Sequence, residues 1–277
     1  MPWIMSLIFY STAASLLLTM SQLENKTIIV TGASQGLGKC IVENILNNYT
    51  HTNVVLVARN EELLKSCYNS LPKDKQSRSL IIVGDVTDSN TIIKTIDETL
   101  NKFGKIDSVI FNAGIIEPVG HLNEPNYDID SMKKLFDINY FSIVEFINKL
   151  LTTIPNKSPI NLIFVSSGAS TRGIDGWLAY GSSKAAINQL CKQLNDEMFP
   201  IVKCISIAPG VVNTPMQKTI REKFSDKMTT KSHERFINLY KNNELLDGMV
   251  VGKVYGRLAV EGIPENVCGE YVRWNEL

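Results

Sequence analysis

The feature that most constrains the fold is an alternation of short apolar runs with longer amphipathic stretches from about residue 25 onward. The runs are rich in β-branched side chains, and the longer stretches have the spacing of surface helices. This rhythm is typical of βα units that build a parallel sheet. The strands predicted in this way cover residues 27–31, 53–58, 80–83, 108–111, 161–166, 202–207 and 271–274.

The predicted strands are apolar on both sides. The runs VVLV at 54–57 and LIFV at 162–165 show no polar alternation, as expected where helices cover both faces of a sheet. No internal repeat, low-complexity block or Pro/Gly/Ser-rich linker divides the chain, and 277 residues can form one large α/β domain. We therefore predict an α/β fold with a doubly wound parallel sheet, in a single domain over residues 20–277.

Charge and cysteine content exclude several classes of protein. The 28 Lys and Arg residues balance 28 Asp and Glu residues, and 44% of the chain is hydrophobic. This composition is neither that of a disordered chain nor that of an electrostatic nucleic-acid binder, so no nucleic-acid partner is expected. The five cysteines form no CxxC pair and have no His at ligand spacing, so we expect no metal site and a reducing compartment.

The segment before the domain has its own character, because the first charged side chain is Glu24. Residues 3–19 are apolar or neutral and, at about 17 residues, have the minimum length for a helix that spans a bilayer. No Lys or Arg precedes them, which argues against a secretory or mitochondrial signal. Two explanations stay open: residues 1–19 are an extension ahead of a domain that starts at Met20, or residues 3–19 are a membrane anchor. Without an anchor, we expect a cytoplasmic protein.

The stretch from Pro215 to Asp247 departs from the βα rhythm and is rich in Lys, Arg, Asn and Met. It predicts one or two helices inserted before the last strand. These helices either form a lid over a ligand cleft or are a solvent-exposed insertion, and the sequence supports both interpretations.

A glycine-rich turn, TGASQGLG at 31–38, follows the first strand and opens the helical stretch 39–46. At such a turn glycines let the backbone approach a pyrophosphate, and the helix N-terminus offers free N–H groups. The alternative is a tight turn that needs glycine only for its dihedral angles. The candidate cofactor-binding residues of this turn are Gly32, Ser34, Gln35, Gly36, Leu37 and Gly38.

The end of the second strand carries Ala58 and Arg59 where a fold that selects NAD usually has Asp or Glu. A guanidinium at this place can pair with the 2′-phosphate of NADP, so NADPH/NADP⁺ is favoured over NAD. The alternative is that Arg59 is a solvated loop charge. Asp85 and Val86 end the third strand, where the carboxylate either meets the adenine amine or caps a helix over residues 87–100.

These residues resemble the short-chain dehydrogenases/reductases, and the resemblance extends from about Asn25 to Trp274. It implies a Rossmann-type fold with a nicotinamide cofactor, a small-molecule carbonyl substrate and a homo-oligomer. The motifs that carry it are TGASQGLG at 31–38, Asp85, Asn112-Ala113-Gly114, Asn139, Ser167, Tyr180 with Lys184, and Pro209-Gly210.

Tyr180 and Lys184 lie one turn apart on a predicted helix that runs from Tyr180 to about Phe199. A nearby ammonium stabilises tyrosinate and lowers the pKa of the phenol toward the range where it is an effective acid. The resemblance adds that Lys184 hydrogen-bonds the nicotinamide ribose. Ser167 ends the fifth strand, where it would stabilise charge on the substrate oxygen, whereas Ser166 points to the other side of the strand.

The remaining motif residues take their roles from the resemblance. Asn139, a polar amide among apolar neighbours, would hold a water linked to Lys184; the alternative is a hydrogen-bonded amide in the core. The turn at 112–114 would support the cofactor-facing end of the sheet. The segment after the sixth strand would meet the nicotinamide carboxamide, through Pro209, Gly210, Val212 and Thr214.

Two positions depart from the common family pattern. Gln35 stands where many NADP-preferring relatives have a basic residue, which weakens the cofactor prediction, and Phe111 replaces the first Asn of a commoner motif. Neither change touches the predicted acid–base residues.

The expected reaction is hydride transfer to a carbonyl carbon while Tyr180 protonates the oxygen. The stretch after Thr214 and the ending at 269–275 resemble the fungal benzil reductase and sepiapterin-reductase-like branch, which implies a compact aromatic ketone or vicinal dicarbonyl. The pocket walls would include Trp177, Met216 and Phe224. Two alternatives are a membrane-anchored lipid or steroid ketone dehydrogenase and a non-catalytic NADP-binding regulator, and the intact catalytic residues argue against the second.

Overall fold

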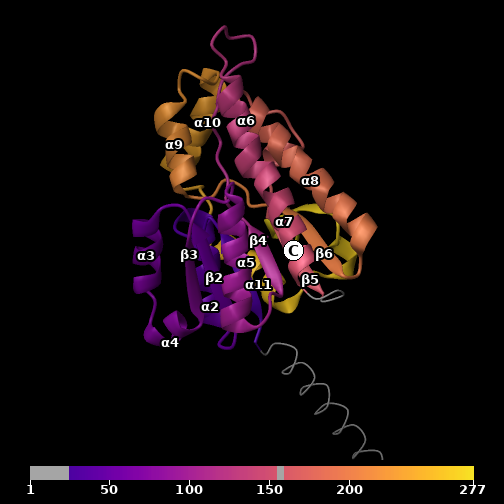
Figure 1. Ribbon diagram of the computed structural model, residues 1–277. Coiled ribbons are helices and arrows are strands. Elements are labelled where there is room, and N and C mark those ends of the chain that lie inside the picture. The colour runs from indigo at the N-terminus through magenta and orange to yellow at the C-terminus, as the bar shows by residue number, and fades with distance from the viewer. Residues whose placement is uncertain (1–24, 155–158) are drawn as a thin grey trace, which may run out of the picture.

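The computed structural model describes residues 25–154 and 159–277. Both explanations for residues 1–19 therefore concern a segment outside the described residues. The described chain forms a seven-stranded parallel sheet in the order β3-β2-β1-β4-β5-β6-β7 (Figure 1). The strands are β1 (Thr27–Thr31), β2 (Asn53–Ala58), β3 (Ser79–Val83), β4 (Ser108–Phe111), β5 (Ile160–Val165), β6 (Val202–Ala208) and β7 (Tyr271–Arg273).

The predicted doubly wound parallel sheet is confirmed, and its strand boundaries shift by at most one residue. β5 ends at Val165 rather than at Ser166, although the Ser166 backbone N–H still donates to the Ile207 carbonyl at 2.8 Å. β7 ends at Arg273 because Trp274 already begins a short 3₁₀ turn.

Helices cover both faces of the sheet, as the apolar strands require. The helices are α2 (Gly36–Asn48), α3 (Glu61–Asn69), α4 (Lys73–Ser77), α5 (Ser89–Phe103), α6 (Ile129–Phe136), α7 (Ser142–Thr153), α8 (Leu178–Met198), α9 (Pro215–Lys223), α10 (Thr230–Lys241) and α11 (Gly248–Glu261). Along β5, Ile163 belongs to the core cluster under α2 and α11, and the next residue, Phe164, belongs to the cluster under α5, α7 and α8.

The segment between α6 and α7 is a π-helical turn, Asp137–Phe141, so the two helices form one long rod with a local widening. Short 3₁₀ turns occupy Gly168–Ser170, Glu265–Val267 and Trp274–Glu276. No helix of residues 25–154 and 159–277 is both long enough and apolar enough to cross a membrane.

The stretch after Thr214 folds into two helices, α9 and α10, which is the number the sequence allowed. They lie with α6 beyond the end of the sheet, at the top of Figure 1. A third apolar cluster lies there, and it joins Trp177 and Tyr180 of the α8 region to Ile220 and Phe236 of α9 and α10. This cluster places the inserted helices next to the carboxyl ends of the strands, where α/β folds bind their ligands.

Candidate active site

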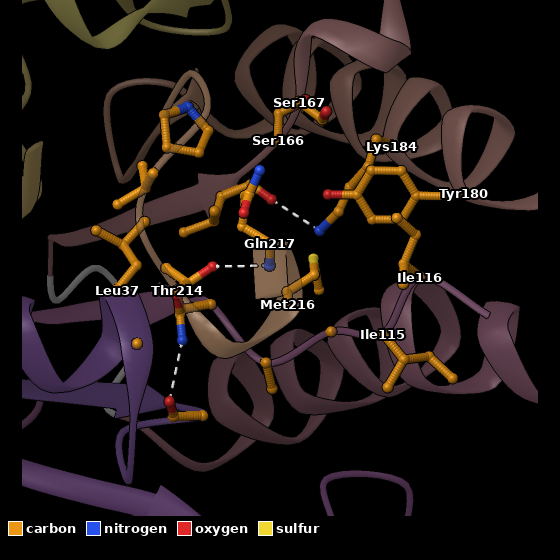
Figure 2. Close-up of a pocket in the computed structure, with 18 of the residues that line it drawn as sticks. Leu37, Ile115, Ile116, Ser166, Ser167, Tyr180, Lys184, Thr214, Met216 and Gln217 are labelled. Carbon is orange, nitrogen blue, oxygen red and sulfur yellow. Dashed lines mark hydrogen bonds between the residues drawn. The ribbon is translucent and has the colours of Figure 1, made fainter. Parts of the chain in front are cut away.

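A cavity of about 680 Å³ opens at the carboxyl ends of the strands. Its walls come from the segments that follow β1, β2, β3, β4, β5 and β6, and from α9, α10 and the chain after β7. Figure 2 shows part of it, with Leu37 and Thr214 at one side and Ser167, Tyr180 and Lys184 at the other.

The glycine turn forms one end of the cavity. Gly32 and Gly36 have φ of 66° and 56°, in the left-handed region that favours glycine. α2 begins at Gly36, three residues before the predicted start at 39, and its N-cap residue Gln35 makes no side-chain capping bond. The first N–H groups of α2 therefore remain free to donate to an anion in the cavity, and the positive end of the helix dipole favours such an anion.

Gly38 does not line this cavity, and its contact with a cofactor stays a prediction. A Cβ at Gly38 would lie 2.3 Å from the Gly32 carbonyl oxygen and 2.5 Å from Asn112 Nδ2. Glycine is needed there for close packing of the helix against its own turn. The Asn112 amide completes this junction, because it donates to the carbonyls of Thr31 at 2.9 Å and Gly32 at 3.1 Å.

Arg59 and Asp85 face each other across the ends of β2 and β3, and both line the cavity. Arg59 Nη1 lies 3.3 Å from Asp85 Oδ2, and the side chains are 55% and 36% exposed. Burial by itself would raise the pKa of Asp85, but hydrogen bonds from Thr87 and the Arg59 charge outweigh it and lower that pKa. The predicted capping role of Asp85 is wrong, since α5 begins at Ser89 and its N-cap is Asp88.

Ser167, Tyr180 and Lys184 meet at the far end of the cavity. Lys184 Nζ donates to the Val165 carbonyl at 2.8 Å and lies 5.8 Å from the centroid of the Tyr180 ring. Burial lowers the pKa of Lys184 to about 8. The Ser166 hydroxyl instead donates to Asn188 Oδ1 at 2.7 Å, although Ser166 also lines the cavity.

The pKa of Tyr180 differs from the sequence expectation. Burial raises it above the ordinary phenol value, and a hydrogen bond with the Ser167 hydroxyl acts in the opposite direction. Lys184 is not among the groups that shift this pKa, and its ammonium donates to the Val165 carbonyl. Figure 2 shows Tyr180 and Lys184 side by side on the cavity wall.

Asn139 lies behind this group and does not line the cavity. Its amide accepts from the Ile115 N–H at 2.9 Å and donates to the Ile115 carbonyl at 2.9 Å and to Ser183 Oγ at 3.2 Å. These hydrogen bonds are those expected of a core amide, and the role of Asn139 in holding a water linked to Lys184 stays a prediction. It sits in the π-helical turn at 137–141, a kind of irregularity that is frequent at functional sites.

The segment after β6 passes over the middle of the cavity. Gly210 has φ of 76°, and Thr214 Oγ1 accepts from the Gln217 N–H at 3.3 Å to cap α9. The predicted cofactor residues that line the cavity are Gly32, Ser34, Gln35, Gly36, Leu37, Arg59, Asp85, Val86, Asn112, Ala113, Gly114, Tyr180, Lys184, Pro209, Gly210, Val212 and Thr214.

The wall beyond Tyr180 is largely apolar. Trp177 and Met216 line it as predicted, whereas Phe224 is buried in the apolar cluster and does not reach the cavity. Sequence reasoning missed several lining residues of this wall, although the spacing of Met216 and Ile220 on one helical face was a usable signal. The missed residues include Ile115, Ile116, Arg172, Ile174, Gln217, Ile220, Arg235, Phe236, Tyr271, Arg273 and Trp274.

The fold and the cavity together define a dinucleotide-binding α/β oxidoreductase. The free helix N-terminus at the glycine turn and the polar group around Tyr180 lie in one cavity, so the residues present fit a nicotinamide dinucleotide. The sequence profile described as short chain dehydrogenase matches residues 26–225, and the chain belongs to this family. Members of the family use a nicotinamide cofactor, and this chain is an oxidoreductase for carbonyl compounds and the corresponding alcohols.

Individual relatives agree with this assignment. A Saccharomyces cerevisiae protein described as benzil reductase ((S)-benzoin forming) IRC24 is 39% identical over 256 residues, covering 91% of this chain and 96% of that protein. The crystal structure of the KRED1-Pglu enzyme has a TM-score of 0.84 and 44% identity, over 89% of this chain and all of that one. That of YIR035C from Saccharomyces cerevisiae has a TM-score of 0.85 and 40% identity, over 90% of this chain and 96% of that one.

Proposed function

We propose that the protein is an NADPH-dependent carbonyl reductase that reduces a ketone or a vicinal dicarbonyl compound. The observation that carries the proposal is the meeting of Ser167, Tyr180 and Lys184 in the same cavity as the glycine turn and Arg59. The similarity to a relative described as benzil reductase supports a dicarbonyl as substrate. The five free cysteines support a reducing, cytoplasmic location.

Each part of the cavity has a task in binding the cofactor. The N–H groups at the start of α2 would hold the pyrophosphate, and Arg59 would pair with the 2′-phosphate. Asp85 and Val86 border the adenine end, while Val212 and Thr214 border the nicotinamide end. When bound, the nicotinamide supplies the hydride.

The protein's own residues then deal with the substrate oxygen. The Ser167 hydroxyl orients the carbonyl and stabilises the negative charge that develops on its oxygen. Tyr180 donates the proton that completes the alcohol, and a positive charge on Lys184 stabilises the tyrosinate left behind. Burial of the phenol raises its pKa and keeps the proton on it before the reaction, so Lys184 has to act as the oxygen loses that proton.

The two inserted helices cover the substrate end of this cavity, and we propose that they form a lid. α9 contributes Met216 and Ile220 to the wall, and α10 contributes Phe236. Excluding water there strengthens every electrostatic interaction with the reacting carbonyl.

The experiment that tests the proposal measures NADPH oxidation with a panel of ketones and dicarbonyls, using the wild type and Tyr180→Phe. We expect the variant to lose on the order of 10²–10⁴-fold in turnover, because a general acid contributes about that much. NADPH binding, followed by fluorescence, should remain. Tyr68→Phe, the same change at a tyrosine outside the cavity wall, is the matched control. Near-normal turnover by Tyr180→Phe would refute the mechanism.

A further inference from the structure

The outer wall of the substrate end carries two arginines from distant parts of the chain. Arg172 follows the 3₁₀ turn after β5, and Arg235 lies on α10. Both line the main cavity, and both also line a second, smaller cavity of about 280 Å³ beside it. Because Ile174 and Phe236 line both cavities too, the two guanidinium groups stand where the cavities adjoin.

The charges of these two arginines are not used within the described residues. Neither side chain forms an ion pair or a hydrogen bond with residues 25–154 or 159–277. Asp175 is the carboxylate of the smaller cavity, but it is bound to His121 Nε2 at 2.9 Å and to the Thr229 N–H. Glu234, the neighbour of Arg235 along α10, lines neither cavity.

An apolar surface links this basic pair to the proposed proton donor. The Trp177 ring meets the Tyr180 ring edge-on at 5.5 Å and stacks on the Phe236 ring at 5.2 Å. The Arg235 guanidinium carbon lies 5.7 Å from the centroid of that same Phe236 ring. A molecule that lies along the Trp177 and Phe236 rings thus meets the phenol of Tyr180 at one end and the guanidinium of Arg235 at the other.

We propose that Arg172 and Arg235 form a subsite for an oxyanion, a carboxylate or a phosphate, carried by the carbonyl substrate. Guanidinium groups present paired N–H donors that match the oxygens of either anion. Since both arginines are exposed, the attraction weakens as ionic strength rises. The proposal rests on the proposed reductase function for the reaction, but binding at the subsite does not require turnover.

The first test measures binding alone, by calorimetry in the presence of NADP⁺, with three probes that cannot be reduced. These are benzoate, phenyl phosphate and the neutral benzamide, each titrated into the wild type, the double variant R172Q/R235Q and the control K241Q. Lys241 has the same charge and lies on the same helix, but it lines neither cavity.

We expect the wild type to bind an anionic probe more tightly than benzamide. The double variant should weaken that probe roughly tenfold or more, as expected for loss of charge-assisted hydrogen bonds. Benzamide and NADPH should bind all three proteins alike. Loss of benzoate binding alone identifies a carboxylate site, and loss of phenyl phosphate binding alone identifies a phosphate site.

The second test compares turnover of 4-acetylbenzoate, whose carboxylate and ketone lie at opposite ends of the ring, with that of the neutral 4-acetylbenzamide. The double variant should raise KM for the anion and leave KM for the neutral amide almost unchanged. If the wild type reduces neither compound but the double variant still loses the anionic probe, the reductase proposal fails and the subsite stands. Three results would overturn the proposed subsite. They are an equal loss of affinity for benzoate and benzamide in the double variant, a loss of NADPH binding in that variant, and no preference of the wild type for an anionic probe.

Discussion

The proposed preference for NADPH depends on the side chain after β2. Arg59 points at the cavity from the end of that strand, and its nearest charged partner is Asp85, 3.3 Å away. No carboxylate occupies the position of Arg59 itself, where it would repel a phosphate. The pair is partly exposed, so its mutual attraction is weak and a phosphate can compete for the guanidinium.

Removing this guanidinium should affect the two nicotinamide cofactors unequally. Arg59→Ala is expected to weaken NADPH binding about tenfold or more, because a charge-assisted hydrogen bond is lost, and to leave NADH binding nearly unchanged. Fluorescence titration with both cofactors is the measurement. Lys65→Ala on α3, which removes a similar charge outside the cavity, serves as control. Equal weakening of both cofactors would contradict the role of Arg59 in selectivity.

At the scale of elements, the junction between β1, α2 and β4 depends on one glycine. The space around Gly38 is filled by the Gly32 carbonyl, which is part of the backbone, and by the Asn112 side-chain amide, which donates to that carbonyl. Gly38→Ala should therefore destabilise the fold by about 1–3 kcal/mol, as overpacking does, and should weaken NADPH binding by displacing the turn.

Urea unfolding and NADPH titration check this prediction. Gly173→Ala is the control, since a Cβ there meets nothing within 4 Å and its φ is not in the left-handed region. A Gly38→Ala variant as stable as Gly173→Ala would show that the turn has room that the structure does not indicate.

Three loops at the substrate end are tied together by one histidine. His121, after β4, contacts Glu124 Oε1 at 3.0 Å through Nδ1 and Asp175 Oδ1, after β5, at 2.9 Å through Nε2. Asp175 also accepts from the Thr229 N–H between α9 and α10. Hydrogen bonds with Asp175 and then Glu124 raise the pKa of His121. The Thr229 N–H and then His121 lower the pKa of Asp175, and His121 lowers the pKa of Glu124.

The stabilising effect of this histidine should depend on pH. Because its pKa is higher in the folded state, the contribution is fully present below about pH 6.5, the unfolded value, and is lost as pH rises through the folded value. The carboxylates act in the opposite sense and lose their contribution in acid. The Tm difference between the wild type and His121→Gln should thus be larger at about pH 6 than at about pH 9.

A matched variant separates this effect from a general loss of histidine. His51 is exposed in the turn before β2, and His51→Gln should change Tm equally at both pH values. A Tm difference for His121→Gln that does not vary with pH would rule out the charged link.

At the scale of the whole molecule, the described residues contain a complete sheet with a core on each face. β1 begins at Thr27, and the clusters on both faces are built from residues after it. We therefore expect a chain that starts at Met20 to have the same Tm and the same NADPH oxidation as the full chain. Thermal unfolding and NADPH oxidation assays of both chains check this expectation, and ultracentrifugation of lysates tests the anchor. Recovery of the full chain in the membrane pellet, with the shorter chain in the supernatant, would support the anchor.

More of the fold than of the site could be predicted from the sequence. The strands follow from local apolar runs, and the glycine turn and the Tyr180–Lys184 pair follow from short motifs, so all of them were predictable. The packing role of Gly38 and the burial of Phe224 were not predictable, because each depends on which atoms a neighbouring element places against the residue. Spacing likewise places Lys184 one turn from Tyr180, but only the fold directs its ammonium to the Val165 carbonyl and buries the phenol, which raises the pKa of Tyr180.

The sequence by itself determined the class of fold and the positions of its strands along the chain, and it supplied the motifs that predict the acid–base residues. These are properties of periodicity and of residues close together in the chain. Only the tertiary structure decided that Arg172 and Arg235, on separate segments, share the wall of one cavity, and that His121 joins three loops. Such encounters depend on how the sheet and the inserted helices pack, and no local pattern encodes that geometry.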